Sequence, residues 1–492
     1  MGLAAVLPLL ASGLVALLGS RPNLRETATL VVGAATFLMV WGLVDEVRAG
    51  ERPRLSLIEV VPGVELAFEV EPLGLLFALV ASFLWVVTTI YAIGYMRGHR
   101  EKNQTRFFLF FAVAIAGALG VAFSANLFTL FAFYEALTLC TFPLVTHHQS
   151  DAARRAGRIY LGILLSTSVG LQLLAIIWTW QLAGTVDFVP GGVLAGTATA
   201  GVLGTILTLF VFGVGKAAVM PFHRWLPAAM VAPTPVSALL HAVAVVKAGV
   251  FTVLKVSVYI FGIDLLSELA AADWLAWVAA ATIILGSLVA FTKDNLKARL
   301  AYSTISQLSY IVLAALLANR WGVIGGGMHI AMHAFGKITL FFAAGAVMVA
   351  AHRKSVSEMH GLGRRMPVTF GAFLIGSLAI IGLPPAGGSW SKWFLGMGTL
   401  EADQIGLLAV LMLSSLLSLY YLLEVPVKAF LGGGTERGGI EDAGEEGFGR
   451  FGIREAPAPA LVAMIATAAC TVALFFWPGL VFELASLIAD GG

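Results

Sequence analysis

The amino-acid sequence predicts an all-α polytopic membrane protein, and two observations lead to this prediction. Hydrophobic residues make up 59% of the 492 residues and charged residues only 12%, with a mean hydropathy of +0.92. Apolar runs of about 20 residues, the length that a helix needs to cross the hydrocarbon layer, recur along nearly the whole chain. A membrane β-barrel would instead show many short segments of alternating polarity.

We expect about fourteen membrane spans. The apolar N-terminal stretch lacks the basic leading region of a signal peptide and many further spans follow it, so we interpret it as the first span. The expected spans lie near residues 3–19, 27–45, 73–96, 106–122, 124–145, 157–181, 197–219, 235–262, 271–291, 302–318, 323–351, 368–399, 405–424 and 457–485.

Two of the connections have a recognisable character. The one before the third span contains VELAFEV, whose alternation of apolar and polar residues predicts a small β-hairpin. The connection at 425–456 is rich in glycine, charge and proline, which indicates a flexible loop. Cys140 and Cys470 stand alone in apolar stretches and are interpreted as small core residues.

The basic residues support this division and orient it. If the N-terminus lies outside, most of them fall in loops that face the cytoplasm, as the positive-inside rule requires. The outside loops then hold only Arg48, Arg52, Arg54 and Arg320. We therefore expect a multi-pass protein of the inner (plasma) membrane with both termini on the outer face.

Five lysines and one glutamate fall inside the expected spans, where a charge costs a few kcal/mol and by default marks an ion path. They are Glu135, Lys216, Lys247, Lys255, Lys337 and Lys392. A row of lysines can load and release protons in sequence, because burial disfavours the charged amine and a nearby carboxylate favours it.

Glu135 and Lys216 are the natural pair of opposite charge. If the glutamate swings away, the lysine loses its counter-charge and tends to release its proton. The alternative is a static buried ion pair that only holds helices in register.

Histidines extend the row. His241 precedes Lys247 by six residues, and the segment HIAMHAFGKITLF places His329, His333 and Lys337 on one helical face. Histidine exchanges protons near neutral pH, so this stripe suits a proton relay. The i, i+4 histidine spacing could also bind zinc, but no third or fourth ligand is evident, so we expect no metal site.

Two spans contain helix-breaking residues next to a lysine. VFGVGKAAVMPFHRWLP surrounds Lys216, and AIIGLPPAGGSWSKWFLG precedes and includes Lys392. Interrupted spans at matching places in two halves are typical of inverted-repeat transporters. We therefore divide the chain into N-terminal helices, a first repeat, a second inverted repeat, the loop and a last helix, at residues 1–105, 106–262, 263–424, 425–456 and 457–492.

Three motifs occur in a fixed order: GKAAVMPFHRWLPAAMVAPTPVSALLHAVAVVKAGVF, DNLKARLAYSTISQLSYI and IGLPPAGGSWSKWFL. Together they resemble the antiporter-like subunits of respiratory complex I, membrane-bound hydrogenases and Mrp-type cation/proton antiporters, most closely the D-type subunits of the Mrp antiporters. The resemblance covers roughly spans three to thirteen. It implies fourteen core helices, two inverted five-helix repeats, broken seventh and twelfth helices, and a polar axis through the middle of the membrane.

The resemblance also assigns residues to that axis. Glu135 matches the family's fifth-helix glutamate and Lys216 its seventh-helix lysine. His241 and Lys247 match the eighth-helix pair, Lys337 the eleventh-helix lysine and Lys392 the terminal group of the twelfth helix. His333 joins this row, with His329 and Lys255 as secondary candidates. Ser389 stands where relatives often carry an aromatic residue, a departure that removes no titratable group.

We therefore predict a proton-translocating membrane subunit of a multisubunit Na⁺/proton antiporter. The sequence contains no Rossmann fingerprint, P-loop or cysteine-rich cluster motif, so we expect no cofactor and no catalytic site. Drive would come from an ion gradient or from partner membrane subunits, and no nucleic acid is expected as a partner.

Three alternatives remain open. The chain would look much the same as the pump module of a redox-driven, complex I-like or hydrogenase complex, and so as part of an NADH:quinone oxidoreductase-like enzyme. It could also serve as the proton-channel partner of an inorganic-carbon uptake complex, or as a purely structural membrane scaffold.

Overall fold

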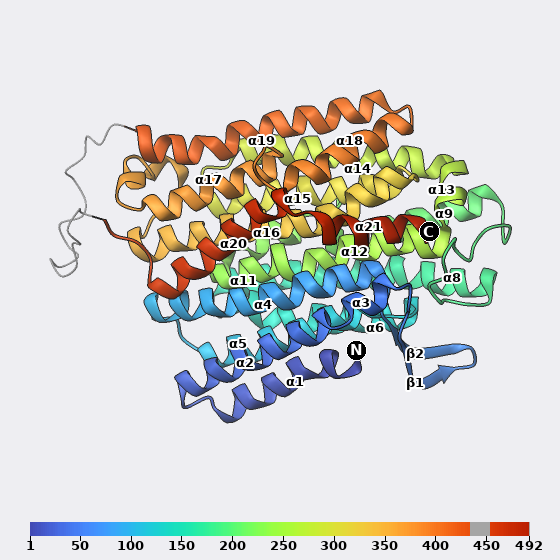
Figure 1. Cartoon of the computed structure of the whole chain (residues 1–492), viewed down its shortest axis with the longest axis horizontal. Coiled ribbons are helices and arrows are strands. Elements are labelled where there is room, and N and C mark those ends of the chain that lie inside the picture. The colour runs from blue at the N-terminus through green and yellow to red at the C-terminus, as the bar shows by residue number, and fades with distance from the viewer. Residues whose placement is uncertain (433–452, 492) are drawn as a thin grey trace.

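The computed structural model describes residues 1–432 and 453–491. The chain forms a bundle of long helices that run in nearly the same direction or against it (Figure 1). Both termini lie toward the end of the bundle that carries the β-hairpin (Figure 1). The connection between α4 and α5 lies at the opposite end. This arrangement is an all-α polytopic membrane fold, as predicted from composition.

The N-terminal part contains three long helices and the predicted hairpin. Strands β1 and β2 pair antiparallel, with Arg54 opposite Glu69 and Val61 opposite Val64. The elements are α1 (Gly2–Leu17), α2 (Pro22–Trp41), α3 (Val44–Arg48), β1 (Arg54–Val61), β2 (Val64–Glu69) and α4 (Pro72–Gly98). Glu71 caps α4, since its carboxylate accepts the backbone N–H groups of Leu73 and Gly74.

The first expected repeat is built around α12. Three π-helical turns, η1, η4 and η5, interrupt its helices, and π turns are frequent at functional sites. The elements are α5 (Gln104–Ala122), α6 (Leu127–Val145), α7 (Asp151–Thr167), η1 (Ser168–Gln172), α8 (Leu173–Ala183), α9 (Ala200–Gly213), η2 (Gly215–Ala217), α10 (Trp225–Ala228), η3 (Ala229–Val231), α11 (Thr234–Ala238), η4 (Leu239–Val243), α12 (Val245–Val256) and η5 (Ser257–Phe261).

The second expected repeat is built around α16, and two shorter helices follow it. As in the first repeat, the fourth span is interrupted, here between α17 and α18. The elements are α13 (Ile263–Glu268), α14 (Ala270–Thr292), α15 (Leu296–Leu316), α16 (Arg320–Ala351), η6 (Val356–Glu358), η7 (Leu362–Arg364), α17 (Pro367–Ile381), α18 (Gly388–Glu401), α19 (Ile405–Leu431), α20 (Ala458–Phe476) and α21 (Gly479–Asp490).

Each of the fourteen expected spans falls on a helix or an interrupted helix. In the described part of the chain, ten helices are long and apolar enough to cross a membrane, and α1, α9 and α17 are shorter apolar helices. The remaining span is α15, which begins with a basic segment. The predicted breaks in the seventh and twelfth spans are also present, after Gly213 and after Ile381.

Two boundaries were wrong. The last span, placed at 457–485, is two helices, because the backbone leaves the helical conformation at Trp477. The loop placed at 425–456 begins later, since α19 continues to Leu431 with Pro426 inside it. Residues 433–452, the rest of that predicted loop, lie outside the described residues.

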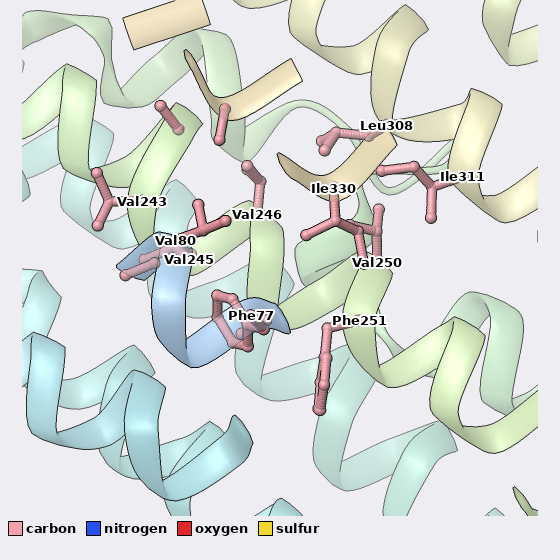
Figure 2. Close-up of a cluster of buried hydrophobic side chains, with 14 of the residues drawn as sticks. Phe77, Val80, Val243, Val245, Val246, Val250, Phe251, Leu308, Ile311 and Ile330 are labelled. Atoms are coloured by element: carbon pink, nitrogen blue, oxygen red, sulfur yellow. The ribbon is translucent and has the colours of Figure 1, made fainter. Parts of the chain in front are cut away.

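The core sits around α12, where the two expected repeats meet. Figure 2 shows Val245, Val246, Val250 and Phe251 from α12 beside Phe77 and Val80 of α4, with Leu308, Ile311 and Ile330 above them. The rings of Phe77 and Phe251 lie 5.1 Å apart. All of these side chains are buried. Part of this apolar layer lies between Lys247 and Lys255 on α12.

Candidate functional site

Lys216 lies at the point where the seventh span stops being helical. Gly213 and Gly215 pack against the backbone of Gln172 and the side chain of Thr167, contacts that leave no room for a Cβ. The chain then turns, and Lys216 enters the protein interior with no exposed surface. Backbone of this kind is tolerated at membrane depth only where protein surrounds it.

The Lys216 amine binds α6 and not a carboxylate. Its Nζ donates to the carbonyl oxygen of Tyr134 at 2.8 Å and to the hydroxyl of Thr138, and it lies 3.1 Å from the centre of the Tyr134 ring. The tyrosine hydroxyl in turn accepts the backbone N–H of Lys216 at 3.0 Å. The amine therefore has a fixed position against α6, and no carboxylate of the described residues contacts it.

Glu135 is the opposite case, a carboxylate without a partner. Among the described residues, no basic group lies within 4.0 Å of it, and neither of its buried oxygens accepts a hydrogen bond. It follows Tyr134 on α6 and so stands next to the residue that binds Lys216. Glu135 on α6 and Lys216 at the break of the seventh span therefore lie near each other, as expected. Their charged groups are not in contact, so they do not form an ion pair.

Lys247 and His333 are in direct contact across α12 and α16. Lys247 Nζ lies 2.7 Å from His333 Nδ1, and both side chains are buried. Such a contact holds one proton between two nitrogens, because either the ammonium donates to the imidazole or the imidazole donates to the amine. Gly249, two residues along α12, packs directly on the backbone of Lys216 and Ala217, which brings the Lys216 break against α12.

Contacts continue from His333 to the second helix break. The rings of His333 and His329 lie 5.7 Å apart, and His329 Nδ1 is 2.8 Å from the hydroxyl of Ser391 on α18. Lys392 follows Ser391 and donates to Ser415 at 2.9 Å and to the Ile381 carbonyl at 3.1 Å. Lys392 is only partly buried, in contrast to the lysines before it.

Lys337 occupies a side branch of hydroxyl groups. Its Nζ donates to Ser303 of α15 at 2.8 Å, and the Tyr421 hydroxyl of α19 donates to the same serine at 2.9 Å. Ser418 lies 3.0 Å from the tyrosine hydroxyl. Hydroxyl groups both donate and accept, so such a branch can pass a proton.

His241 sits in the π turn η4, directly before α12. Its ring lies 4.7 Å from the ring of Phe341, and within the described chain neither of its nitrogens has a hydrogen-bond partner. Gln307, on α15, is likewise buried without partners for its side-chain amide. Buried polar groups are normally satisfied by protein or by ordered water, so these two positions mark polar, hydratable interior.

Lys255, the secondary candidate, lies apart from this row in a closed ion pair. Its Nζ is 3.1 Å from Glu71 Oε1 and 2.8 Å from the carbonyl oxygen of Ser124. The hydroxyl of Tyr259 donates to the other oxygen of Glu71 at 3.1 Å. Together with the two backbone N–H groups that it caps, Glu71 is fully satisfied.

The structure thus joins Lys247, His333 and His329 in one line of contacts, which reaches Lys392 through the ring of Tyr310, 5.6 Å from the His329 ring and 4.7 Å from Lys392 Nζ. Lys337 lies on the same face of α16 as His333 and has its own hydroxyl partner, Ser303. The structure sets Lys216 beside the line and Glu135 beside Lys216. The sequence reasoning missed the residues that hold these groups, chiefly Tyr134, Thr138, Ser303 and Ser391. Only the polar run STISQLSY inside an expected span could have pointed to Ser303.

A family model described as "NADH:quinone oxidoreductase/Mrp antiporter, TM" matches residues 124–418, more than half of the chain. A second, "NADH-Ubiquinone oxidoreductase (complex I), chain 5 N-terminus", matches residues 62–108. NADH-quinone oxidoreductase subunit N of Desulforudis audaxviator is 32% identical over 412 residues, 82% of this chain and 80% of that protein. NAD(P)H-quinone oxidoreductase chain 5 of Picosynechococcus is 31% identical over 68% of this chain, which spans only 54% of that protein.

Two solved structures share the fold over nearly their whole length. A chain of the Mrp complex from Dietzia superposes with a TM-score of 0.85 at 24% identity, covering 100% of this chain and 97% of that chain. A chain of the archaeal membrane-bound sulfane sulfur reductase superposes with a TM-score of 0.84 at 21% identity, covering 99% and 97%. At these identities the likeness establishes the architecture.

Proposed function

Because the chain belongs to the NADH:quinone oxidoreductase/Mrp antiporter family and is a proton-translocating, antiporter-like membrane subunit, we propose that it works in a multisubunit Na⁺/proton antiporter. The observation that carries this proposal is the line of titratable contacts centred on the 2.7 Å bond between Lys247 and His333. The fold of a chain of an Mrp complex matches this chain over its full length, which supports an antiporter as the assembly in which the chain works.

The proposed route follows the contacts. Protons enter from the inside near Lys247 and Lys337, and Lys216 regulates Lys247 through its charge. His333 and His329 carry the proton toward Ser391 and Lys392. Lys392 is the exit group, since it stands at the second helix break, where the row of lysines and histidines ends. Each step moves one proton between a nitrogen and a nitrogen or oxygen and forms no other bond.

Glu135 acts as the switch in this proposal. A carboxylate without a hydrogen-bond partner among the described residues, next to the residue that holds Lys216, has no hydrogen bond that fixes its position. When it approaches Lys216 the ammonium is stabilised, and when it withdraws the amine releases its proton. The partners would be the other membrane subunits of the complex, placed in the inner (plasma) membrane with both termini of this chain outside.

The experiment compares wild type with Lys216→Ala and Glu135→Ala in everted membrane vesicles that contain the assembled complex. A Na⁺-dependent pH change should be present in wild type and lost in both variants, while the amount of assembled complex stays the same. Loss of assembly, with normal transport by the fraction that remains, would contradict the proposal and favour a static ion pair.

A redox-driven pump is the second candidate, and the relatives named as NADH-quinone oxidoreductase subunits favour it. Purification of the intact complex in mild detergent separates the two. Co-purified iron–sulfur or flavin proteins, with pumping that needs a reduced substrate and no Na⁺, would replace the antiporter assignment. Co-purification with a carbon-capturing protein would indicate the third assembly.

A further inference from the structure

A polar pocket of about 440 Å³ opens beside the α4–α5 connection, at the end of the bundle that we expect to face the cytoplasm. It lies at the seam between the two expected repeats. One side is formed by the end of α4, the α6–α7 connection and the segment before α11, and the other by the start of α15 and the end of α16. The line of lysines and histidines described above does not include any of its lining residues.

Glu101 is the centre of the titratable groups in this pocket. Its carboxylate lies 3.9 Å from His99 Nε2 and 3.8 Å from His148 Nδ1, and its side chain is 9% exposed. One acid between two imidazoles is a group of proton acceptors at the water boundary, and imidazole exchanges protons near neutral pH.

The charges around this group come from every neighbouring element. Lys297 of α15 donates to the carbonyl oxygen of Ala232 at 2.6 Å. Arg353 lines the pocket and lies 3.8 Å from Glu358, which is not one of the lining residues. The remaining charged or titratable groups that face or adjoin the pocket are Tyr95, His147, His352 and Lys354.

The floor of the pocket leads to the buried line along two helices. Thr234 and Ala344 both line the pocket, and α11 and η4 pack against α16. Seven residues after Thr234 stands His241, and seven residues before Ala344 stands Lys337. On the regular helix α16, a separation of seven residues keeps Ala344 and Lys337 on the same face and spans about 10 Å, while α11 and the π turn η4 lead from Thr234 to His241.

His241 connects the two routes. It contacts Phe341, which lies on the same face of α16 between Ala344 and Lys337. Within the described residues both of its ring nitrogens are buried and free of hydrogen bonds. A group of this kind, below a polar pocket and above Lys337, is placed to receive a proton from one side and release it to the other.

We propose that this pocket is the mouth through which protons enter from the inside solution, with Glu101 and His148 collecting them and His241 passing them to Lys337. The proposal rests on the proposed function, since it supplies the uptake step of that transport. Each proton is bound first at the Glu101 carboxylate or a histidine nitrogen, then at His241 and then at the Lys337 amine, and no other bond changes.

The test uses the assembled complex in everted vesicles, where the inside face is exposed to the medium. Glu101→Gln and His148→Asn remove the collecting groups. Asp151→Asn and His360→Asn are matched controls on exposed positions of the same face, outside the pocket. Transport rates are measured at low and at high concentration of a mobile pH buffer, and as a function of pH.

At low buffer concentration we expect Glu101→Gln and His148→Asn to slow transport on the order of tenfold, because a charged surface cleft raises the local supply of its ion by about that factor or more. High buffer concentration should restore the rate, since the buffer delivers protons directly. The control variants should match wild type. A purely structural role for Glu101 would give a loss that buffer does not restore, and that result would overturn the proposal.

A second variant keeps the test decisive if Glu101→Gln reduces assembly. Met348→Cys places a thiol on the pocket wall, and a bulky, membrane-impermeant thiol reagent should then stop transport. Wild type, whose only cysteines are Cys140 and Cys470 in α6 and α20, is the control. Unchanged transport after the thiol of Met348→Cys has reacted completely would refute the proposal that protons enter through this pocket. Absence of transport in wild type would instead refute the proposed function itself.

Discussion

Two pairings of glutamate with lysine inside the part of the chain that the structure describes differ in how completely they are satisfied. Glu71 and Lys255 form an ion pair at 3.1 Å, both Glu71 oxygens accept further hydrogen bonds, and the Lys255 ammonium also donates to the carbonyl oxygen of Ser124. Glu135 and Lys216 are neighbours without contact, and the Glu135 oxygens accept no hydrogen bond from the described residues.

In the proposed function this difference distinguishes a structural pair from one that takes part in transport. A closed pair at the end of α12 ties the start of α4, the α5–α6 connection and η5 together, and moving a proton through it would break several contacts at once. In the proposed function the open pair is the switch, because among the described residues no hydrogen bond to the Glu135 oxygens has to break before the carboxylate moves. Phe251, whose ring packs against Phe77 (Figure 2), lies between Lys247 and Lys255 on α12.

Breaking the closed pair should have the largest effect on stability. Lys255→Met leaves the Glu71 carboxylate buried without its counter-charge, at a cost of about 3–5 kcal/mol. Thermal unfolding of the detergent-solubilised complex measures it. The double variant Lys255→Met/Glu71→Gln, which removes both charges, should recover much of the loss. A single variant as stable as wild type would show that the pair is not structural.

Filling the contact between α12 and the Lys216 break should have the next largest effect. A Cβ at Gly249 would meet the backbone of Lys216 and Ala217, so Gly249→Ala should destabilise the chain by about 1–3 kcal/mol and reduce transport. Gly162→Ala is the matched control, because no atom lies within 4 Å of its added Cβ, and it should be neutral or slightly stabilising. Equal behaviour of the two variants would refute the close packing at Gly249.

Removing the imidazole next to Lys247 should affect transport more than stability. His333→Gln deletes the ring nitrogen at 2.7 Å and should slow proton movement about tenfold or more, as expected for loss of a positioned acid–base group. Exposed His360→Gln serves as the control in the same vesicle assay. A His333→Gln complex with the wild-type rate would remove histidine from the route.

The weakest of these effects concerns a histidine in a loop outside the spans. Burial, with Arg106 and His148 nearby, lowers the pKa of His147 to about 4, and its Nε2–H donates to the Lys102 carbonyl at 3.0 Å. Because the unfolded chain binds this proton at a higher pH than the folded chain does, stability should fall as the pH drops from about 6.5 toward 4. His147→Gln should flatten that dependence, and an unchanged curve would show that other groups cause it.

The sequence predicted the elements of this comparison better than their contacts. Span number, the hairpin and the two helix breaks follow from local signals: apolar length, alternation, and glycine or proline next to a lysine. The placement of Lys247, His333 and Lys337 within spans was likewise visible. These features depend on a few neighbouring residues.

Partners across the fold were not predictable in the same way. Glu71 looked like part of an outside loop, because the contact with Lys255 joins residues far apart in sequence and needs η5 and the α4 cap to be in place. The expected contact between Glu135 and Lys216 could be stated only as opposite charges. The Lys216 amine binds Tyr134 and Thr138 instead. This contact depends on the direction that the backbone takes after Gly213, which the sequence does not specify.

The distinction between an open and a closed pair can be measured as Na⁺-dependent proton movement per assembled complex in Glu135→Gln and Glu71→Gln, assayed side by side in everted vesicles. Both changes remove one buried carboxylate charge and keep its shape. We expect Glu135→Gln to abolish transport in a fully assembled complex, and Glu71→Gln to assemble poorly but transport normally per complex. Normal transport by Glu135→Gln, or loss of transport in a fully assembled Glu71→Gln complex, would contradict the assignment of the two pairs.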